Sequence, residues 1–409
     1  MTAAAARSTV SARPFDAVLD PTTHVQGVPH RLFDRMRDEA PVYSHGRIDG
    51  QNVWSLTRIA DIQEVSRDVR RFSSASGTVF PNVRARWERT TGPIEDMAFS
   101  DPPLHTRLRG YASRAFSPSV MRTMRGWIED VVAGVLDAAQ EKRELDIVHD
   151  ISEQLPSRVI TGLLGVPLED REWVIETSNR TFSSSNPKIG PAGALAAREE
   201  ILTYALRMRE LRLAEPADDM TTELTRAEAA GEPITETEFA NIFLALLSAG
   251  FETTHSLLTH SLVLFTRRPE LLAPLREAPD QQWAAVIEEL LRVNAPISHM
   301  ARTATEDTEI GGQAIERGDY LITWFAAANY DPAAFERPYE VDFARRPRHT
   351  AFGAGGPHLC LGNQLARLES RVMLSEFAKR GLRLELTAEP QRAANVFLNV
   401  VSSAPAAWR

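Results

Sequence analysis

The sequence has a single cysteine, Cys360, in a setting that could support a reactive or metal-binding thiolate. It lies in the stretch HTAFGAGGPHLCLGNQLARLE, between a glycine-rich run and a segment with helical periodicity that closes at Gly381. At a helix N-terminus, the helix dipole and free backbone N–H groups stabilise a thiolate. The glycines before it would let a flat group lie against bare backbone.

Four chemical roles are open to a lone cysteine. Most often it is an inert, buried small hydrophobe. A nucleophile needs a base, and His358 is near in sequence, but no triad or oxyanion pattern is readable. A zinc site needs more ligands, and neither CxxC nor HExxH occurs. The fourth role is a thiolate ligand to haem iron. A phosphate-binding loop is excluded, because His358 replaces the third glycine of G-x-G-x-x-G and no G-K-[ST] follows.

A second group of polar residues interrupts an apolar helical segment. A capping box at Thr235 starts a run to Arg268 of over 30 residues. At 1.5 Å per residue this is roughly 50 Å, enough to cross the molecule. Gly250, Glu252 and Thr253 lie in its middle, and a buried acid costs several kcal/mol unless it is paired or protonated. The segment predicts either a kinked helix with a salt-bridged acid or a helix break that lines a pocket.

Composition limits the class of protein. The 409 residues are 43% apolar and 25% charged, which is typical of a soluble globular chain. A net charge of -9 argues against nucleic-acid binding. One cysteine cannot form an internal disulfide, and no apolar run is long enough for a signal peptide or a membrane anchor, so we expect a cytoplasmic protein.

The remaining pattern predicts a mainly α chain with small β-sheets and no clean domain boundary. A hairpin is expected around Asp49-Gly50, a second strand pair in Thr308–Phe325, and a third from Leu382. We expect a flexible tail at residues 1–15 and a single domain at residues 16–409.

Several motifs together resemble the cytochrome P-450 superfamily. The segments that carry the resemblance are FGAGGPHLCLGNQLARLE, which resembles the haem-binding loop; EELLR, which supplies E-x-x-R as Glu289 and Arg292; AGFETT, the I-helix oxygen-activation motif; DPPLHTRLR, the bacterial C-helix motif; and HMAR and AANYDP, which occur in the family's order. They extend from about residue 100 to 370. The resemblance implies a single triangular-prism domain with a long central I helix, of the bacterial ferredoxin-dependent type.

The resemblance also implies a cofactor and its contacts. Cys360 would be the axial thiolate on the iron of haem b, and Glu252 and Thr253 the catalytic pair that delivers protons to bound dioxygen. Ala249 and Gly250 would leave room for oxygen. Glu289 and Arg292 would be a structural ion pair. The other cofactor-binding residues would be the propionate partners His105, Arg109, Arg302 and His358, and the haem contacts Ala249, Phe352, Gly353, Gly362 and Ala366.

The family layout implies a substrate pocket, and Phe80 and Trp87 fall near it. A histidine in it, His299, could contact a polar group of the substrate. Ser183–Gly193 would be a flexible lid between two helices. The predicted lining residues are Phe99, Phe182, Phe243, Leu247, Ile297, His299, Phe397 and Leu398.

Two departures from the family pattern leave questions open. The cysteine loop is one residue longer than the commonest form, and the I-helix ETT is shared with oxidisers of sterols, branched lipids and terpenes. The Arg that usually joins the E-x-x-R pair is replaced near Glu340, and Arg345 or another group could take its place.

The expected function is haem-dependent monooxygenation. One atom of O2 would enter a C–H bond of a moderately large apolar molecule: a steroid, terpenoid, aromatic or secondary-metabolite precursor. NAD(P)H would supply electrons through ferredoxin reductase and ferredoxin to a monomeric enzyme. The patch for an acidic partner would comprise Arg114, Arg345, Arg346 and Arg348. The alternatives are a haem-thiolate peroxygenase that uses H2O2 and a non-catalytic haem protein that binds a ligand.

Overall fold

The computed structural model describes residues 13–81, 96–113, 116, 118–181, 189–229 and 231–409. The α-helices are α1 (His30–Glu39), α2 (Ile59–Arg67), α4 (Leu104–Ser113), α5 (Pro118–Gln140), α6 (Gln154–Leu163), α7 (Arg171–Thr181), α8 (Gly190–Ala214), α9 (Met220–Thr225), α10 (Glu236–Arg267), α11 (Pro269–Leu272), α12 (Asp280–Val293), α13 (Phe325–Ala328) and α14 (Asn363–Lys379). The shorter helical turns are η1 (Asp16–Leu19), η2 (Pro21–His24), η3 (Met97–Phe99), the π-helical η5 (Ile147–Ser152), η6 (Leu168–Asp170) and η7 (Ala273–Leu275).

The strands form one five-stranded sheet and smaller pairings. The sheet has the order β1-β2-β10-β7-β3, with β2 and β10 parallel and the other neighbours antiparallel. A three-stranded sheet has the order β11-β14-β4, and β5-β6, β8-β9 and β12-β13 pair separately. The strands are β1 (Val42–Ile48), β2 (Gln51–Leu56), β3 (Phe72–Ser73), β4 (Glu144–Asp146), β5 (Glu228–Ala229), β6 (Glu232–Pro233), β7 (His299–Ala304), β8 (Thr308–Ile310), β9 (Gln313–Ile315), β10 (Tyr320–Trp324), β11 (Leu384–Leu386), β12 (Gln391–Arg392), β13 (Val401–Ser403) and β14 (Pro405–Trp408).

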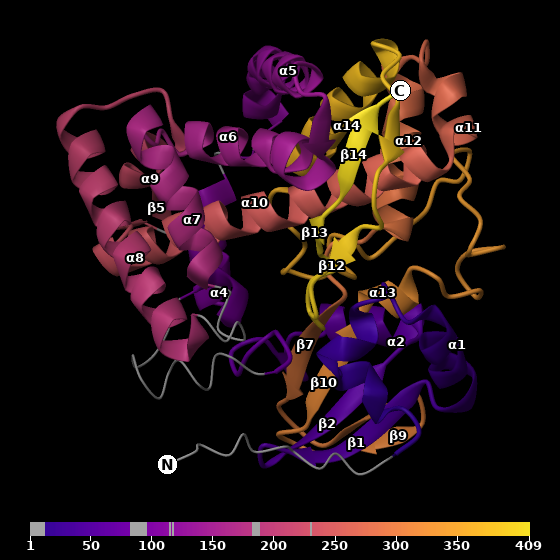
Figure 1. Cartoon of the computed structure of the whole chain (residues 1–409). Helices are drawn as coiled ribbons and strands as arrows, with labels where there is room; N and C mark the ends of the chain where they lie inside the picture. The colour runs from indigo at the N-terminus through magenta and orange to yellow at the C-terminus, as the bar shows by residue number, and fades with distance from the viewer. Residues whose placement is uncertain (1–12, 82–95, 114–115, 117, 182–188, 230) are drawn as a thin grey trace, which may run out of the picture.

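The predicted strand pairs are confirmed. β1 and β2 form a hairpin through Asp49 and Gly50, both at positive φ. In Thr308–Phe325, β8 and β9 turn at Gly311 and Gly312, while β10 joins the large sheet. Figure 1 shows this β-rich part with α1, α2 and α13 beside the larger helical part.

The long helix α10 crosses the middle of the molecule (Figure 1). It starts with the predicted capping box, in which Thr235 Oγ1 accepts from the Glu238 N–H. By length and composition α10 could cross a membrane, but 72% of its most apolar window is buried, as in a core helix. The predicted break is absent, because α10 continues without interruption through Gly250. Packing against α6, α8 and α14 offsets the cost of about 1 kcal/mol for an internal glycine.

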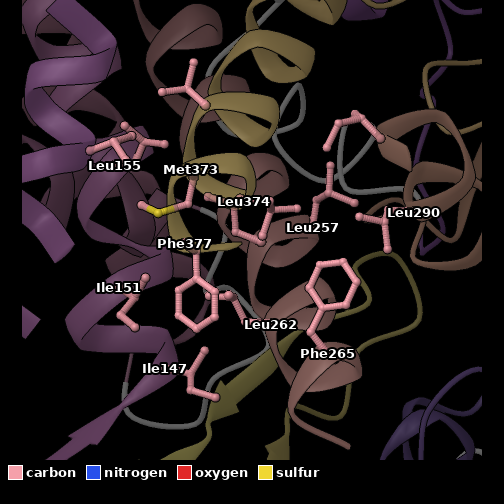
Figure 2. Close-up of a cluster of buried hydrophobic side chains, with 14 of the residues drawn as sticks. Ile147, Ile151, Leu155, Leu257, Leu262, Phe265, Leu290, Met373, Leu374 and Phe377 are labelled. Carbon is pink, nitrogen blue, oxygen red and sulfur yellow. The ribbon is translucent and has the colours of Figure 1, made fainter. Parts of the chain in front are cut away.

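The largest core cluster among the described residues joins several helical elements. Figure 2 shows Ile147, Ile151 and Leu155 of η5 and α6 converging with side chains of α10, α12 and α14. This apolar layer fixes the cysteine-bearing end of α14 relative to α10. At the other end of the chain Phe15 is buried and packs edge-on to Tyr43, so the predicted tail boundary after residue 15 is wrong at that residue. Residues 1–12 lie outside the described residues.

Candidate active site

The loop before α14 holds Cys360 in a fixed backbone. The Cys360 N–H donates to the Phe352 carbonyl oxygen at 2.9 Å, and Asn363 Nδ2 donates to the Cys360 carbonyl oxygen at 2.6 Å. Gly356 has φ 79°, and a Cβ there would lie 2.3 Å from the Ser66 carbonyl oxygen. The glycine-rich run is therefore required both by backbone conformation and by close packing on the end of α2.

The Cys360 thiol is suited to a cationic partner. It is enclosed by protein yet keeps some exposed surface. Burial raises the pKa of the Cys360 thiol, although the Gly362 N–H and the charges of Arg109 and Arg367 act in the opposite direction. A thiolate at this place therefore needs a further positive charge, which a metal ion supplies. α14 begins at Asn363 rather than at Cys360, so the thiol lies just before the helix.

Basic side chains with unused polar atoms gather beside the cysteine loop. The rings of His105 and His358 are 4.1 Å apart between centroids. Both ring nitrogens of His105, Nε2 of His358 and Nε of Arg302 are buried without a hydrogen-bond partner among the described residues. Burial lowers the pKa of Arg302 to about 10 and that of His358 to about 3. Arg109 joins this group, since its charge acts on both histidines.

This basic group fits a cofactor with two carboxylates. Orphaned buried donors are rare in folded proteins, because each costs about 1–3 kcal/mol. Among the described residues, Asp101 is the carboxylate whose charge acts on both His105 and Arg302. Its oxygens already accept from Ser73 Oγ at 2.5 Å and the Ser74 N–H at 2.8 Å. The two propionates of haem would satisfy the donors that Asp101 leaves unpaired.

The middle of α10 borders open space. Ala249 is exposed although most neighbouring residues of α10 are buried. Thr253 Oγ1 donates to the Ala249 carbonyl oxygen at 2.9 Å. Burial raises the pKa of Glu252 to about 7, and the charge of Glu153 adds to the effect. Glu252 can therefore both hold and release a proton near neutral pH.

Gly250 does not leave room for oxygen as predicted. A Cβ at Gly250 would lie 2.9 Å from Ile160 Cδ1 of α6. The glycine lets α6 approach α10, and the space predicted from it belongs to a helix–helix contact.

The E-x-x-R pair has a third member in the structure. Arg292 donates to Glu289 through Nε at 2.8 Å and Nη2 at 2.7 Å, and both side chains are fully buried. Arg345 Nε lies 3.3 Å from Glu289 Oε1. Arg345 therefore completes the ion-pair group and is wrong as a member of the surface patch. Arg346 and Arg348 are exposed, and Arg114 lies outside the described residues.

The residues predicted to line the substrate pocket fall into a fully buried group and a partly exposed group. Phe243, Leu247 and His299 are 0% exposed and cannot line an open space, so these three predictions are wrong. Phe243 and Leu247 pack in the α8–α10 core, because facing apolar residues of α8 cover that side of α10. The partly exposed members are Phe99, Ile297, Phe397 and Leu398.

His299 forms hydrogen bonds with backbone groups and is not available to contact a substrate. Its Nε2 accepts from the Phe80 N–H at 3.0 Å, and its Nδ1 lies 3.2 Å from the Val396 carbonyl oxygen. Burial lowers the pKa of His299 to about 3, so the ring is neutral with both nitrogens occupied.

Some predictions fall where the structure gives no description. Phe182 and Trp87 lie outside the described residues, as do residues 183–188 of the predicted lid. The described end of that lid is already helical, since α8 begins at Gly190.

Sequence reasoning missed two features of the site. Arg367 lies over the Phe352 ring at 4.4 Å and pairs with Glu288 at 2.6 Å, which braces the cysteine loop against α12. His255 Nδ1 lies 3.9 Å from Glu252 Oε2. Helical spacing from Glu252 could have suggested His255, because residues i and i+3 share a face.

Comparisons with known proteins agree with this geometry. The model of the Cytochrome P450 family matches residues 198–380. A steroid C26-monooxygenase of Rhodococcus jostii (strain RHA1) is 32% identical over 391 residues, covering 93% of this chain and 82% of the relative. A methyl-branched lipid omega-hydroxylase of Mycobacterium bovis is 31% identical over 392 residues, covering 92% and 90%.

Solved structures share the whole fold. CYP108D1 from Novosphingobium aromaticivorans has a TM-score of 0.88 and 30% identity, with coverage of 98% of this chain and 99% of that chain. Cytochrome P450 CYP268A2 of Mycobacterium marinum, in complex with pseudoionone, has a TM-score of 0.87 and 29% identity, with coverage of 97% and 100%. With its mainly helical fold and its full-length relatives, the chain belongs to the cytochrome P450 family and is a haem b-dependent monooxygenase.

Proposed function

We propose that this enzyme hydroxylates a moderately large apolar substrate of the sterol, branched-lipid or terpenoid type. The observation that carries the reaction is that the only cysteine lies beside buried basic side chains whose polar atoms have no hydrogen-bond partner among the described residues. The substrate class is supported by the names of the full-length relatives and by the partly exposed apolar residues Ile297, Phe397 and Leu398.

In this proposal Cys360 would ligate the iron, and the propionates would accept hydrogen bonds from His105, Arg109, Arg302 and His358. The remaining haem contacts are Ala249, Phe352, Gly353, Gly362 and Ala366. When bound, haem activates O2 so that one atom enters a C–H bond and the other leaves as water. Each turnover consumes two electrons and two protons, which balances the conversion of RH and O2 to ROH and H2O.

The chain's own residues control the proton supply. The Gly362 N–H bonds to Cys360 Sγ and moderates its electron donation. While the Thr253 hydroxyl donates to the Ala249 carbonyl, its oxygen can accept from a water and hold it at the oxygen site on α10; if the hydroxyl turns away from that carbonyl, it can itself donate there. Glu252 returns a proton to this hydroxyl after each transfer, for which a pKa near the working pH is most effective.

Electrons come from a separate protein in this proposal. NAD(P)H reduces a ferredoxin reductase, which reduces a ferredoxin that docks through acidic residues. Arg346 and Arg348 are exposed and lie just before the cysteine loop in the sequence. Their positive charges complement the acidic residues of the ferredoxin. We infer a monomeric cytoplasmic enzyme.

Removing the Thr253 hydroxyl is expected to uncouple the enzyme. In Thr253→Ala, NADH consumption stays within about twofold of wild type, while organic product per NADH falls about tenfold or more and H2O2 replaces it. Thr266→Ala is the matched control, since Thr266 Oγ1 also donates to the carbonyl four residues back, Leu262, at 2.7 Å in the same helix. Equal coupling in Thr253→Ala and Thr266→Ala would contradict the assigned role of Thr253.

Removing the Arg302 charge is expected to weaken haem retention. A charge-assisted hydrogen bond contributes about 1.5–3 kcal/mol, so Arg302→Gln should lose haem to excess apomyoglobin about 10- to 100-fold faster. Arg317→Gln is the control, because Arg317 is exposed in the turn between β9 and β10. Haem transfer at the same rate in both variants would remove Arg302 from the propionate partners.

A direct test of the function is a compound screen followed by isotope labelling. Cholestane steroids, methyl-branched fatty acids and pseudoionone are scored by the low-spin to high-spin shift of the haem absorption. With 18O2, NADH and a surrogate ferredoxin pair, the product should carry one 18O atom. Turnover with H2O2 alone at a matching rate would favour a peroxygenase. Tight binding without product would favour a ligand-binding protein.

A further inference from the structure

The carboxyl of Glu252 has a neighbour that the reaction scheme above does not use. His255, one turn further along α10, places Nδ1 3.9 Å from Glu252 Oε2. The His255 side chain is 3% exposed, and its Nδ1 has no hydrogen-bond partner among the described residues. A buried imidazole nitrogen that has no hydrogen-bond partner and lies near a partly buried acid needs an explanation beyond packing.

The element packed against this part of α10 carries a second acid–imidazole pair. At the junction of η5 and α6, Glu153 Oε2 lies 3.0 Å from His149 Nδ1. Ile147, Ile151 and Leu155 of the same segment face the core shared with α10 (Figure 2). η5 and α6 both pack against α10. Across this contact the charge of Glu153 acts on both Glu252 and His255, and that of His149 acts on His255.

His149 is the most exposed of the four side chains and His255 is the most buried. Their exposed fractions are 59% for His149, 28% for Glu153, 23% for Glu252 and 3% for His255. Every member can carry a proton. The other charged groups that act on the outer pair are Asp146 and Asp150. Asp150 is paired with Lys142, and Asp146 accepts from backbone N–H groups and Ser403.

The chemistry of the pairs suits proton transfer inward. The hydrogen bond to Glu153 raises the pKa of His149, which favours the protonated form of this exposed ring. Burial lowers the pKa of His255 to about 4, which leaves a neutral ring that can accept a proton on one nitrogen while releasing one from the other. The pKa of Glu252, about 7, makes it the receiving acid.

We propose that His149 and Glu153 are the surface entrance of a proton path that reaches Glu252 through the His255 side of α10. A proton passes from water to the His149 imidazole, to the Glu153 carboxylate, and then by His255 or an intervening water to Glu252. Two such transfers refill Glu252 in each turnover, with no net change in the charge of the path. This inference rests on the proposed function of Glu252 as the internal acid.

The first test measures the path without using product formation. The pKa of Glu252 is followed by infrared spectroscopy of the haem-loaded enzyme, with Glu252→Gln to assign the carboxyl band. In Glu153→Gln the Glu252 pKa is expected to fall below its wild-type value, because a neighbouring negative charge that disfavours ionisation is gone. Glu144→Gln, an exposed carboxylate on β4 ahead of the same segment, is the control and should leave the Glu252 pKa unchanged.

The second test measures proton supply during turnover. NADH-driven O2 consumption is recorded with a surrogate ferredoxin and reductase in excess, with pseudoionone present, in H2O and in D2O. Glu153→Gln should slow O2 consumption about three- to tenfold and at least double the solvent isotope effect. This slowing is smaller than a full loss of acid catalysis would cause, because water can partly replace the path. Glu153→Asp, which keeps the acid, should recover most of the rate. The rate should fall as pH rises through the Glu252 pKa, and the fall should begin at lower pH in Glu153→Gln.

The outcomes separate this inference from the proposed function. An unchanged Glu252 pKa together with an unchanged isotope effect in Glu153→Gln would overturn the proton path even if hydroxylation proceeds. If none of the screened compounds is hydroxylated by wild type, the proposed function fails, while the Glu252 pKa in Glu153→Gln still decides whether the two pairs are coupled.

Discussion

Cys360→Ser is expected to lose monooxygenase turnover almost completely, by well over about 100-fold. Removing a group that only supports a metal ligand typically lowers activity by about 10- to 100-fold, so the loss of the ligand itself should be larger. A serine hydroxyl stays protonated near neutral pH and donates far less electron density to iron than a thiolate. The chain has no other cysteine to take over. The measurement is product formed per haem under full electron supply.

Controls for this variant address folding and haem content. The variant should keep the helical circular-dichroism spectrum, because the loop is held by backbone bonds such as that from the Cys360 N–H to the Phe352 carbonyl. Residual haem bound through its propionates is expected, and activity is therefore normalised to haem. Turnover within tenfold of wild type would remove Cys360 from the site.

Arg292→Met is expected to cause the largest loss of stability. Arg292 is fully buried and bonds to Glu289 and to the carbonyl oxygens of Asn329, Pro338 and Glu340. Its removal leaves the buried Glu289 charge with Arg345 alone, and breaking a buried ion pair costs about 3–5 kcal/mol of unfolding free energy. The free energy of unfolding is measured from denaturant midpoints of the haem-free protein.

The matched control for this change is an exposed ion pair. Arg35 and Glu39 are 3.0 Å apart, with side chains 57% and 53% exposed, so Arg35→Met should cost at most about 1 kcal/mol. Equal losses in the two variants would show that the buried group of Glu289, Arg292 and Arg345 does not anchor the segment before the cysteine loop.

Local motifs were readable from the sequence because each carries its own backbone requirement. The capping box at Thr235 starts α10, and the glycine-rich run before Cys360 has the positive φ values that only glycine adopts freely. The basic residues that gather near Cys360 were found through the family resemblance, and the structure brings His105, Arg109, Arg302 and His358 together; their contacts with haem stay predictions.

Features that depend on packing between distant segments were not readable. Gly250 could make room for a ligand or for a helix, and only the position of Ile160 decides between them. Phe243 and Leu247 have the polarity of pocket residues, but α8 covers them. Glu153 gave no signal in the sequence, because its charge acts on Glu252 only once η5 packs on α10.

The assignment of Arg345 shows an intermediate case. Its distance from the E-x-x-R pair in sequence left several partners open, including the residues near Glu340. In the fold the segment around Asp342 places its own N–H 3.0 Å from Glu289 Oε1 and turns Arg345 Nε toward the same oxygen. The family resemblance therefore identified the need for a third partner, and the path of the chain in the fold identified Arg345 as that residue.

The bond between Cys360 and haem iron is the central claim, and the absorption spectrum of the reduced carbon monoxide complex tests it most directly. Because Cys360 is the only cysteine, a thiolate-type red-shifted Soret band in the wild-type enzyme can come from no other residue. We predict that band. A carbon monoxide complex with the Soret position of histidine-ligated haem, from folded enzyme loaded with one haem per chain, would contradict the account.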